Sequence, residues 1–295
     1  MKPPVLFADD TTLLSFAKSQ DDAVKFLNDD LIKVQEWLIC NKLTLNSKKS
    51  KFIIFGRKRT RGSRGYKVVI NNKEIEQVSS TKFLGLTINE KLSWKEHMNG
   101  ILVTIQRNLG IIYKIRRCLN RNVLMQLYYS LIFSHIKYGI VIWHHGNTTE
   151  KKKIQVVINK FMRIIYSMGY RESVRAIMAE NKILSLNQLF TKEIAIVQQK
   201  LESDCLPKHF KDLYANLQNN SSIVTRSRST YNPSFCRSLY FRQNITHIGP
   251  KIWNNVPERT RFDFSNDTVV LYDIKKFKTV IHEYCTSSVP FYENN

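Results

Sequence analysis

Two adjacent aspartates, Asp9 and Asp10, lie between two short β-prone runs near the start of the chain. Val5 to Phe7 precedes them, and Thr11 to Leu14 follows them. An apolar run that stops at two acidic residues and then resumes predicts a tight β-hairpin with the aspartates at its tip. The adjacent aspartates constrain the fold, because neighbouring carboxylates repel each other and a fold that holds them together usually supplies a cation.

The paired carboxylates of Asp9 and Asp10 favour a magnesium site. Hard oxygen ligands suit Mg²⁺, which binds one or two carboxylates and completes its octahedron with water and substrate phosphates. Two such ions can hold the attacking and leaving oxygens of a phosphoryl transfer. A solvated Asp-Asp turn without chemistry is the alternative that the dipeptide by itself leaves open.

The net charge of the chain indicates a polyanionic partner. Its 295 residues carry 46 Lys plus Arg against 24 Asp plus Glu, a formal charge of +22. Basic side chains that neutralise phosphates release condensed counterions, which favours binding to nucleic acid. A generally basic soluble protein and a protein that binds an anionic membrane surface are the alternatives.

The basic residues gather in two places. The stretch Lys48 to Lys67 is basic without any acidic residue, and we expect part of it to lie on a nucleic-acid backbone: Arg57, Lys58, Arg59, Arg61 and Arg64. A second set, also without acidic neighbours, is expected to follow a phosphate backbone: Arg107, Lys114, Arg116, Arg117 and Arg121. Each of these side chains could equally be an ordinary solvated surface charge.

Periodicity predicts an α+β chain. Apolar residues at helical spacing predict a helix over Asp21 to Ile39, Asn71-Asn72-Lys73 predicts a hairpin turn, and Lys82 to Ile88 reads as a strand. Helical patterns then follow over Trp94–Cys118, Asn122–His144, Glu150–Met168, Arg171–Asn181 and Leu186–Glu202, and a closing helix is expected over Thr268–Tyr284. Polar residues interrupt the most apolar stretch, residues 123–143, so we expect a buried helix there and no membrane association.

Several motifs, in order, carry a resemblance to a known family. Phe7-Ala8-Asp9-Asp10 resembles the aromatic-x-Asp-Asp motif of reverse transcriptases, with Phe where many relatives have Tyr. The segments that continue the series are Asn46-Ser47-Lys48-Lys49-Ser50, Phe83-Leu84-Gly85, Leu92-Ser93-Trp94-Lys95-Glu96 and Gly249-Pro250-Lys251-Ile252-Trp253. Together they resemble the late palm, thumb and end segment of jockey-like non-LTR retrotransposon reverse transcriptases.

The resemblance implies a fold and a domain order. It implies a partial palm of antiparallel hairpins plus one helix over residues 1–92, with a primer-grip-like hairpin. A helical thumb bundle over residues 93–204 and a small mixed α/β region over residues 205–295 would follow. It also implies an intracellular protein, with a nuclear location expected from the biology of the family.

The resemblance also assigns residues to roles. Asp9 and Asp10 would bind Mg²⁺, and Lys49 would approach the incoming triphosphate and donate a proton to the leaving pyrophosphate. Phe83, Leu84 and Gly85 would form the primer grip, where a glycine lets a backbone approach closely. The implied partners are an RNA template, a DNA primer and deoxynucleoside triphosphates. An exposed lysine and an ordinary core strand are the corresponding alternatives.

The resemblance further implies that this stretch is incomplete as an enzyme. The reaction needs another metal-binding aspartate and fingers, both of which we expect upstream of Met1. We therefore expect a fragment of an RNA-directed DNA polymerase that is inactive by itself. A non-catalytic, basic RNA- or DNA-binding remnant is the first alternative, and a structural module whose charge is incidental is the second.

Overall fold

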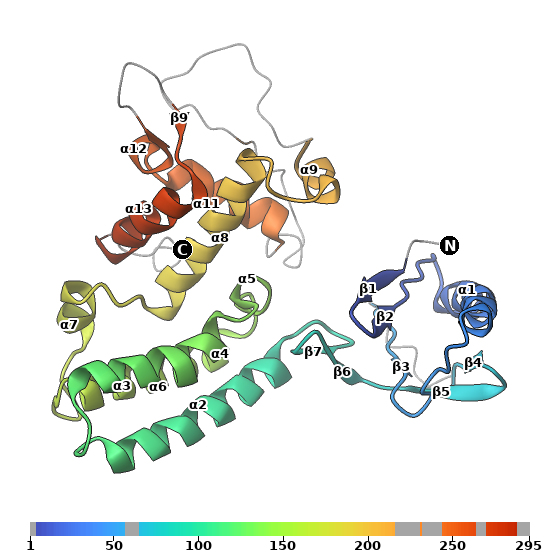
Figure 1. Ribbon diagram of the computed structural model, residues 1–295, viewed down its shortest axis with the longest axis horizontal. Coiled ribbons are helices and arrows are strands. Elements are labelled where there is room, and N and C mark those ends of the chain that lie inside the picture. The colour runs from blue at the N-terminus through green and yellow to red at the C-terminus, as the bar shows by residue number, and fades with distance from the viewer. Residues whose placement is uncertain (1–3, 57–64, 216–230, 232–243, 264–269, 288–295) are drawn as a thin grey trace. The chain divides into compact units, whose positions relative to one another are not determined.

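The structure is a computed structural model that describes residues 4–56, 65–215, 231, 244–263 and 270–287. The chain divides into two compact units, Met1–His97 and Met98–Asn295. Small sheets and one long helix form the described part of the first unit, and the second is mostly helical (Figure 1). The α+β class is therefore confirmed, whereas the palm, thumb and end-domain assignments remain predictions.

The predicted hairpin at the start of the chain is present. β1 (Val5–Phe7) pairs antiparallel with β2 (Asp10–Thr12), and Phe7 lies opposite Asp10. Ala8 and Asp9 form the turn, in which Ala8 has a left-handed φ of 51°. The tip is therefore one residue earlier than predicted, because Asp10 already pairs as the first residue of the return strand.

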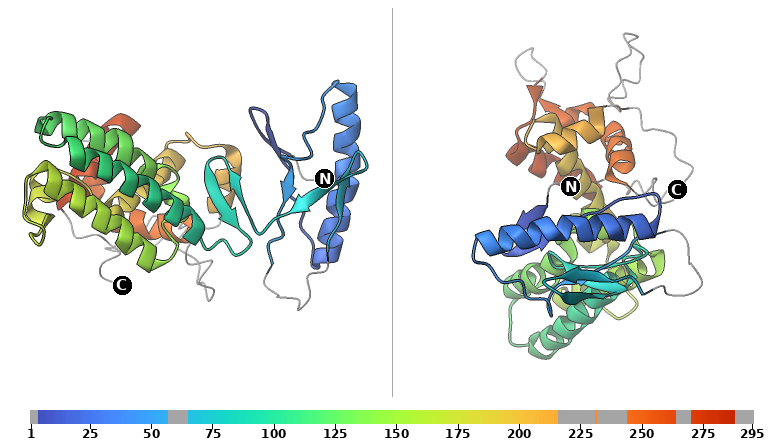
Figure 2. Two further views of the ribbon diagram at one scale, coloured as in Figure 1. Left: turned by 90° about the horizontal axis from the view of Figure 1, so that it is seen from below. Right: turned by 90° about the vertical axis from the view of Figure 1, so that its right-hand side faces the viewer.

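The predicted amphipathic helix is also present. α1 (Gln20–Cys40) begins after Ser19, whose hydroxyl oxygen accepts a hydrogen bond from the Asp22 backbone N–H. Such a cap satisfies one of the free N–H groups of a first helical turn. The apolar stripe of α1 packs against β4 (Val68–Ile70), and Leu31 is buried between them (Figure 2).

A three-stranded sheet lies under α1, in the order β3 (Lys51–Phe52), β5 (Lys73–Gln77) and β4. The predicted hairpin between β4 and β5 is confirmed, and its turn residues Asn71 and Asn72 have φ of 50° and 56°. The expectation of antiparallel hairpins alone was wrong, because β3 runs parallel to β5. The chain between β3 and β5, which includes β4, is long enough for the crossover that a parallel pair requires.

The segment predicted as one strand over Lys82 to Ile88 is a second hairpin. β6 (Ser80–Phe83) pairs antiparallel with β7 (Leu86–Asn89) in a separate two-stranded sheet. Leu84 and Gly85 form the turn with φ of 46° and 79°. Two consecutive residues with positive φ match the right-handed twist of a hairpin, so the strand reverses there instead of continuing.

The second unit begins along α2 (Lys95–Ile115), close to the predicted bounds. The single helix predicted over Asn122 to His144 was wrong as a continuous element. The structure has four shorter pieces there: α3 (Arg121–Tyr128), a π-helical turn η1 (Tyr129–Phe133), α4 (Ser134–Lys137) and α5 (Ile140–Trp143). Tyr138 is extended and Gly139 has a φ of 62°, which breaks the helical hydrogen-bond ladder.

α8 (Leu186–Glu202) is the central helix of the second unit. It contacts α5, α6 (Thr148–Ile165), α11 (Ile245–Asn255) and α13 (Ile274–Ser287) (Figure 1). Its buried residues include Phe190, Ile194 and Gln199, and Ser185 and Gln188 form a capping box at its start. The described part of the unit also contains α7 (Arg175–Glu180), α9 (Lys208–Ala215) and α12 (Glu258–Arg261).

The closing helix starts later than predicted. β8 (Phe262–Asp263) and β9 (Val270–Leu271) form a short antiparallel pair before it. The Asp273 carboxylate then accepts hydrogen bonds from the backbone N–H groups of Lys275 and Lys276, so α13 begins at Ile274. The Gly249-Pro250 pair lies inside α11.

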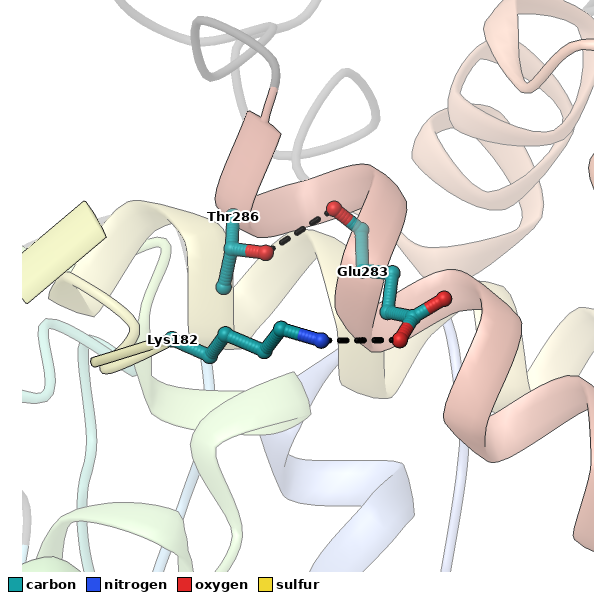
Figure 3. Close-up of polar contacts among 3 residues, drawn as sticks. All are labelled: Lys182, Glu283 and Thr286. Atoms are coloured by element: carbon teal, nitrogen blue, oxygen red, sulfur yellow. Dashed lines mark hydrogen bonds and ion pairs between the residues drawn. The ribbon is translucent and has the colours of Figure 1, made fainter. Parts of the chain in front are cut away.

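Apolar packing and a long-range ion pair between Lys182 and Glu283 help to anchor α13 to the rest of the second unit. Phe277 and Ile281 are fully buried against their neighbours, of which α8 is the main one. Lys182, in the turn before α8, reaches the Glu283 carboxylate at 2.9 Å, and the Thr286 hydroxyl donates to the Glu283 carbonyl oxygen (Figure 3). No helix in the described part of the chain is long and apolar enough to span a membrane.

Candidate nucleic-acid interface

The two aspartates are displayed on the exposed end of the first hairpin. Asp9 occupies the turn, and Asp10 lies opposite Phe7 on the return strand. Side chains that face each other across an antiparallel pair lie on the same face of the ribbon, so Asp10 shares a face with Phe7. Both carboxylates are exposed, and Phe7 retains 62% of its surface in solvent.

The carboxylates of Asp9 and Asp10 fit part of a magnesium shell. They are free of ion pairs and side-chain hydrogen bonds among the described residues, so their oxygens are available to a cation. One or two carboxylates suffice for Mg²⁺ when water and phosphate oxygens complete the octahedron. Among the described residues, no group of three or more His, Cys, Asp or Glu side chains is placed to hold a metal.

Lys49 lies on a separate exposed turn of the same unit. Asn46 organises this turn, because its carbonyl oxygen accepts the backbone N–H groups of Lys49 and Ser50 at 3.1 and 3.0 Å. The Ser50 hydroxyl donates to the same oxygen at 3.1 Å. The turn therefore presents Lys48 and Lys49 to solvent from a hydrogen-bonded loop. Nothing in the described contacts of Lys49 tests its predicted catalytic role.

The residues predicted as a primer grip form the tip of the second hairpin. Phe83 pairs with Leu86 across the strand ends, and Leu84 and Gly85 make the turn. Gly85 is exposed, whereas Phe83 and Leu84 are half-buried. A left-handed leucine is uncommon and mildly strained, so this tip is a well-defined projection. Its role in holding a primer stays a prediction.

The two predicted basic groups have different outcomes. Arg57, Lys58, Arg59, Arg61 and Arg64 lie outside the described residues. The structure does describe the second group, which lies on the last turns of α2, on the connection to α3 and on the first residue of α3. None of its five side chains forms an ion pair among the described residues. Arg116 is half-buried, and the other four are exposed: Arg107, Lys114, Arg117 and Arg121.

Sequence reasoning missed two tyrosines that lie against these arginines. The Arg116 guanidinium lies 3.6 Å from the centre of the Tyr113 ring, and the Arg121 guanidinium lies 5.0 Å from the centre of the Tyr166 ring. The spacing of three residues between Tyr113 and Arg116 was a visible signal, because such residues are neighbours on a helix. The second pair joins α3 to the end of α6 and has no local sequence signal.

The described structure thus has an exposed acidic hairpin, and a basic helix end that forms no ion pair among the described residues. Over somewhat more than half of its length, the chain is distantly similar to reverse transcriptases of non-LTR retrotransposons. No protein-family model matches the sequence, and no solved structure matches the fold.

The relatives are three proteins of Drosophila melanogaster. The RNA-directed DNA polymerase from mobile element jockey is 24% identical over 183 residues, which cover 61% of this chain and 20% of that protein. The probable polymerase from transposon X-element is 25% identical over 162 residues, 54% of this chain and 18% of that protein. The probable polymerase from transposon BS is 26% identical over 170 residues, 56% of this chain. The chain thus spans about a fifth of the length of the curated relatives it matches.

Proposed function

We propose that this chain is the late-palm and thumb part of an RNA-directed DNA polymerase of a non-LTR retrotransposon, and that it binds an RNA template paired with a DNA primer. The similarity to the jockey, X-element and BS polymerases supports this proposal most directly. The exposed hairpin that carries Asp9 and Asp10 agrees with it, because a metal-binding tip must be open to substrate.

In this proposal, Asp9 and Asp10 hold Mg²⁺ through their carboxylates. The bound ion would neutralise charge on the phosphates of the incoming nucleotide. Lys49 would lie near the triphosphate, and the tip formed by Leu84 and Gly85 would contact the primer strand. These assignments follow the resemblance, and the free carboxylates and exposed turns of the described structure are compatible with them.

We further propose that the 295-residue polypeptide by itself binds template and primer without extending the primer. Phosphoryl transfer by two metal ions needs more carboxylate ligands than the adjacent pair supplies, and the described residues contain no larger ligand group. The test is a primer-extension assay on an RNA template with Mg²⁺, run beside a binding assay on the same duplex. Extension that disappears in an Asp9→Ala preparation would show that this second proposal is wrong.

Metal binding separates the polymerase proposal from a purely electrostatic binding remnant. Mn²⁺ is a paramagnetic substitute for Mg²⁺ and broadens the NMR signals of nearby nuclei. We expect broadening confined to residues around Ala8 to Thr11 in the wild-type chain, and its loss in the Asp9→Asn, Asp10→Asn double variant. Nucleic-acid binding by that variant should be unchanged or tighter, because removing negative charge near phosphate does not weaken attraction. If no signals near the hairpin broaden, the result favours the non-catalytic binding remnant.

A further inference from the structure

One end of the helical unit gathers aromatic rings and guanidinium groups from three segments of the chain. The last turn of α2, the start of α3 and the end of α6 lie side by side there, as Figures 1 and 2 both show. Tyr113 and Arg116 come from the first segment, Arg121 from the second, and Tyr166 from the third. We call these four residues the Arg–Tyr platform.

The first pair of the platform is held in place by two interactions. The Arg116 guanidinium stacks on the Tyr113 ring at 3.6 Å and also donates a hydrogen bond to the Tyr113 carbonyl oxygen. That hydrogen bond satisfies a free carbonyl at the end of α2. Because both contacts come from one side chain, the planar guanidinium is fixed before any ligand arrives. Tyr113 keeps 54% of its surface exposed, so a flat surface remains open to solvent.

The second pair extends the same kind of surface. The Arg121 guanidinium lies 5.0 Å from the centre of the Tyr166 ring, within the range of a cation–π contact. Tyr129 is 45% exposed and lies close to Tyr166. Burial raises the pKa of Tyr129, and the Tyr166 hydroxyl raises it further. Burial raises the pKa of Tyr166. The Arg121 guanidinium lowers this pKa, and the nearby Glu180 carboxylate raises it.

The part of the platform that comes from α2 and α3 lies in a stretch of sequence without acidic residues. No aspartate or glutamate occurs between Glu96 and Glu150, and that stretch contains the cations Arg107, Lys114 and Arg117. Cations without carboxylate partners are available to phosphates. A planar aromatic or guanidinium face, by contrast, is useful to a nucleic acid only where a base is unpaired, because the faces of paired bases are covered by their stacked neighbours.

We propose that the Arg–Tyr platform binds unpaired nucleotides of a nucleic-acid strand, with bases stacked on the Tyr113–Arg116 and Tyr166–Arg121 pairs and with Arg107, Lys114 and Arg117 on the adjoining phosphates. This inference rests on the proposed function and adds a specificity to it. The helical unit then prefers single-stranded segments to fully paired duplex, and phosphate contacts alone would give no such preference.

The test compares binding to a single strand and to a blunt duplex of the same length. Fluorescence anisotropy is measured with labelled oligonucleotides of about 15 nucleotides, long enough to cover a site of this type. The variant is Tyr113→Ala with Tyr166→Ala, and the matched control is Tyr113→Phe with Tyr166→Phe, which keeps both rings. Phe210→Ala, which removes an exposed ring on α9, controls for the general loss of an aromatic. Thermal unfolding of every variant verifies that the helical unit is folded.

We expect the alanine variant to bind the single strand about tenfold or more weakly, because each stacked base contributes substantially to affinity. Its affinity for the duplex should change by less than about twofold, and the phenylalanine and Phe210→Ala variants should behave as the wild type. Photocrosslinking with an iodouracil-containing strand should join the strand to Tyr113 or Tyr166.

Two results would overturn the inference and leave the proposed function standing. One is a wild-type chain that binds duplex as tightly as single strand. The other is an alanine variant that loses affinity for both forms equally, or no more than the phenylalanine variant does. A wild-type chain that binds neither form would overturn the proposed function together with the inference.

Discussion

Gly249 packs closely against buried side chains of the second unit. It lies in α11, where that helix contacts α8. A Cβ atom added at Gly249 would lie 2.9 Å from the Gln198 side-chain oxygen and 3.0 Å from the Tyr214 hydroxyl. Both neighbours are buried, and the Tyr214 hydroxyl is already committed to the Ile245 carbonyl oxygen. The glycine therefore lets the two helices approach closely.

Gly249→Ala should destabilise the folded chain. The added methyl group must displace a buried amide and a hydrogen-bonded hydroxyl, and overpacking of this kind costs about 1–3 kcal/mol. The measurement is the free energy of unfolding from urea titration followed by circular dichroism. Gly110→Ala is the matched control, because a Cβ there meets nothing within 4 Å. That change lies inside α2 and should be neutral or stabilising by up to about 1 kcal/mol. Equal effects at the two positions would contradict the account of Gly249.

At the scale of elements, α13 shows which kind of contact holds a helix in place. Its ion pair between Lys182 and Glu283 is conspicuous in Figure 3, yet both side chains are more than half exposed. Ile281 has no exposed surface and packs within the helical core. Exposed ion pairs contribute little because water already solvates both charges, whereas a buried side chain leaves a cavity when it is truncated.

Truncating the two kinds of contact should therefore give very different results. Lys182→Ala should lower the free energy of unfolding by less than about 1 kcal/mol. Ile281→Ala should lower it by about 2–5 kcal/mol. Thermal and urea unfolding of the two variants provide the comparison. A larger loss for Lys182→Ala than for Ile281→Ala would mean that the ion pair, and not the core, anchors α13.

The contact between α5 and α8 contains two adjacent histidines, of which His144 is buried and His145 is half-buried. His144 stacks on Phe190 with ring centres 4.0 Å apart, and its Nε2 lies 3.1 Å from the Asn187 side-chain oxygen. His145 meets the same phenylalanine edge-on. Burial, followed by the positive charge of Lys151, lowers the pKa of both: that of His144 lies well below its usual value, and that of His145 falls to about 4. Both rings are thus neutral near pH 7.

These histidines should make the fold less stable in acid. Between about pH 6.5 and 4 the unfolded chain binds protons that the folded chain does not, so stability is complete above that window and falls as the pH falls through it. For His145 the loss is on the order of 3 kcal/mol. Urea unfolding at a series of pH values measures the slope, and His145→Gln should flatten it. A wild-type slope that the substitution leaves unchanged would exclude His145 as its source.

At the scale of the whole molecule, the excess of positive charge should appear as salt dependence. With a formal charge of +22, the chain is expected to bind nucleic acid by releasing counterions. Each phosphate contact contributes about 0.7–0.9 to the slope of log binding constant against log salt concentration. Arg117→Gln, on the connection between α2 and α3, should reduce that slope by about one contact. Lys25→Gln on α1 is the control, and an equal change there would indicate a diffuse charge effect.

Several elements could be predicted because their causes are local. Alternation and the Asp-Asp pair located the first hairpin, and the spacing of apolar residues located α1. Two asparagines that tolerate positive φ located the turn between β4 and β5. For the same reason, the sequence located Asp9, Asp10 and the cations at the junction of α2 and α3. The roles proposed for these residues rest on similarity and remain predictions.

Other features depended on contacts between distant residues. The segment Asn122 to His144 has helical spacing of apolar residues throughout, but the π-helical turn and the left-handed Gly139 divide it where it packs on the rest of its unit. α11 packs closely on α8 at Gly249, because the absence of a Cβ atom there leaves room for the Gln198 side chain. Arg121 meets Tyr166 because α3 and α6 pack together.

The amino-acid sequence by itself thus determined the charge of this protein, its acidic hairpin and the periodic helices, since sterics and hydrophobic spacing act between near neighbours. Only the tertiary structure decided where helices break, where two helices touch at a glycine and that Arg121 covers the Tyr166 ring. Those outcomes depend on surfaces that come together only when the chain is folded, and no local pattern encodes them.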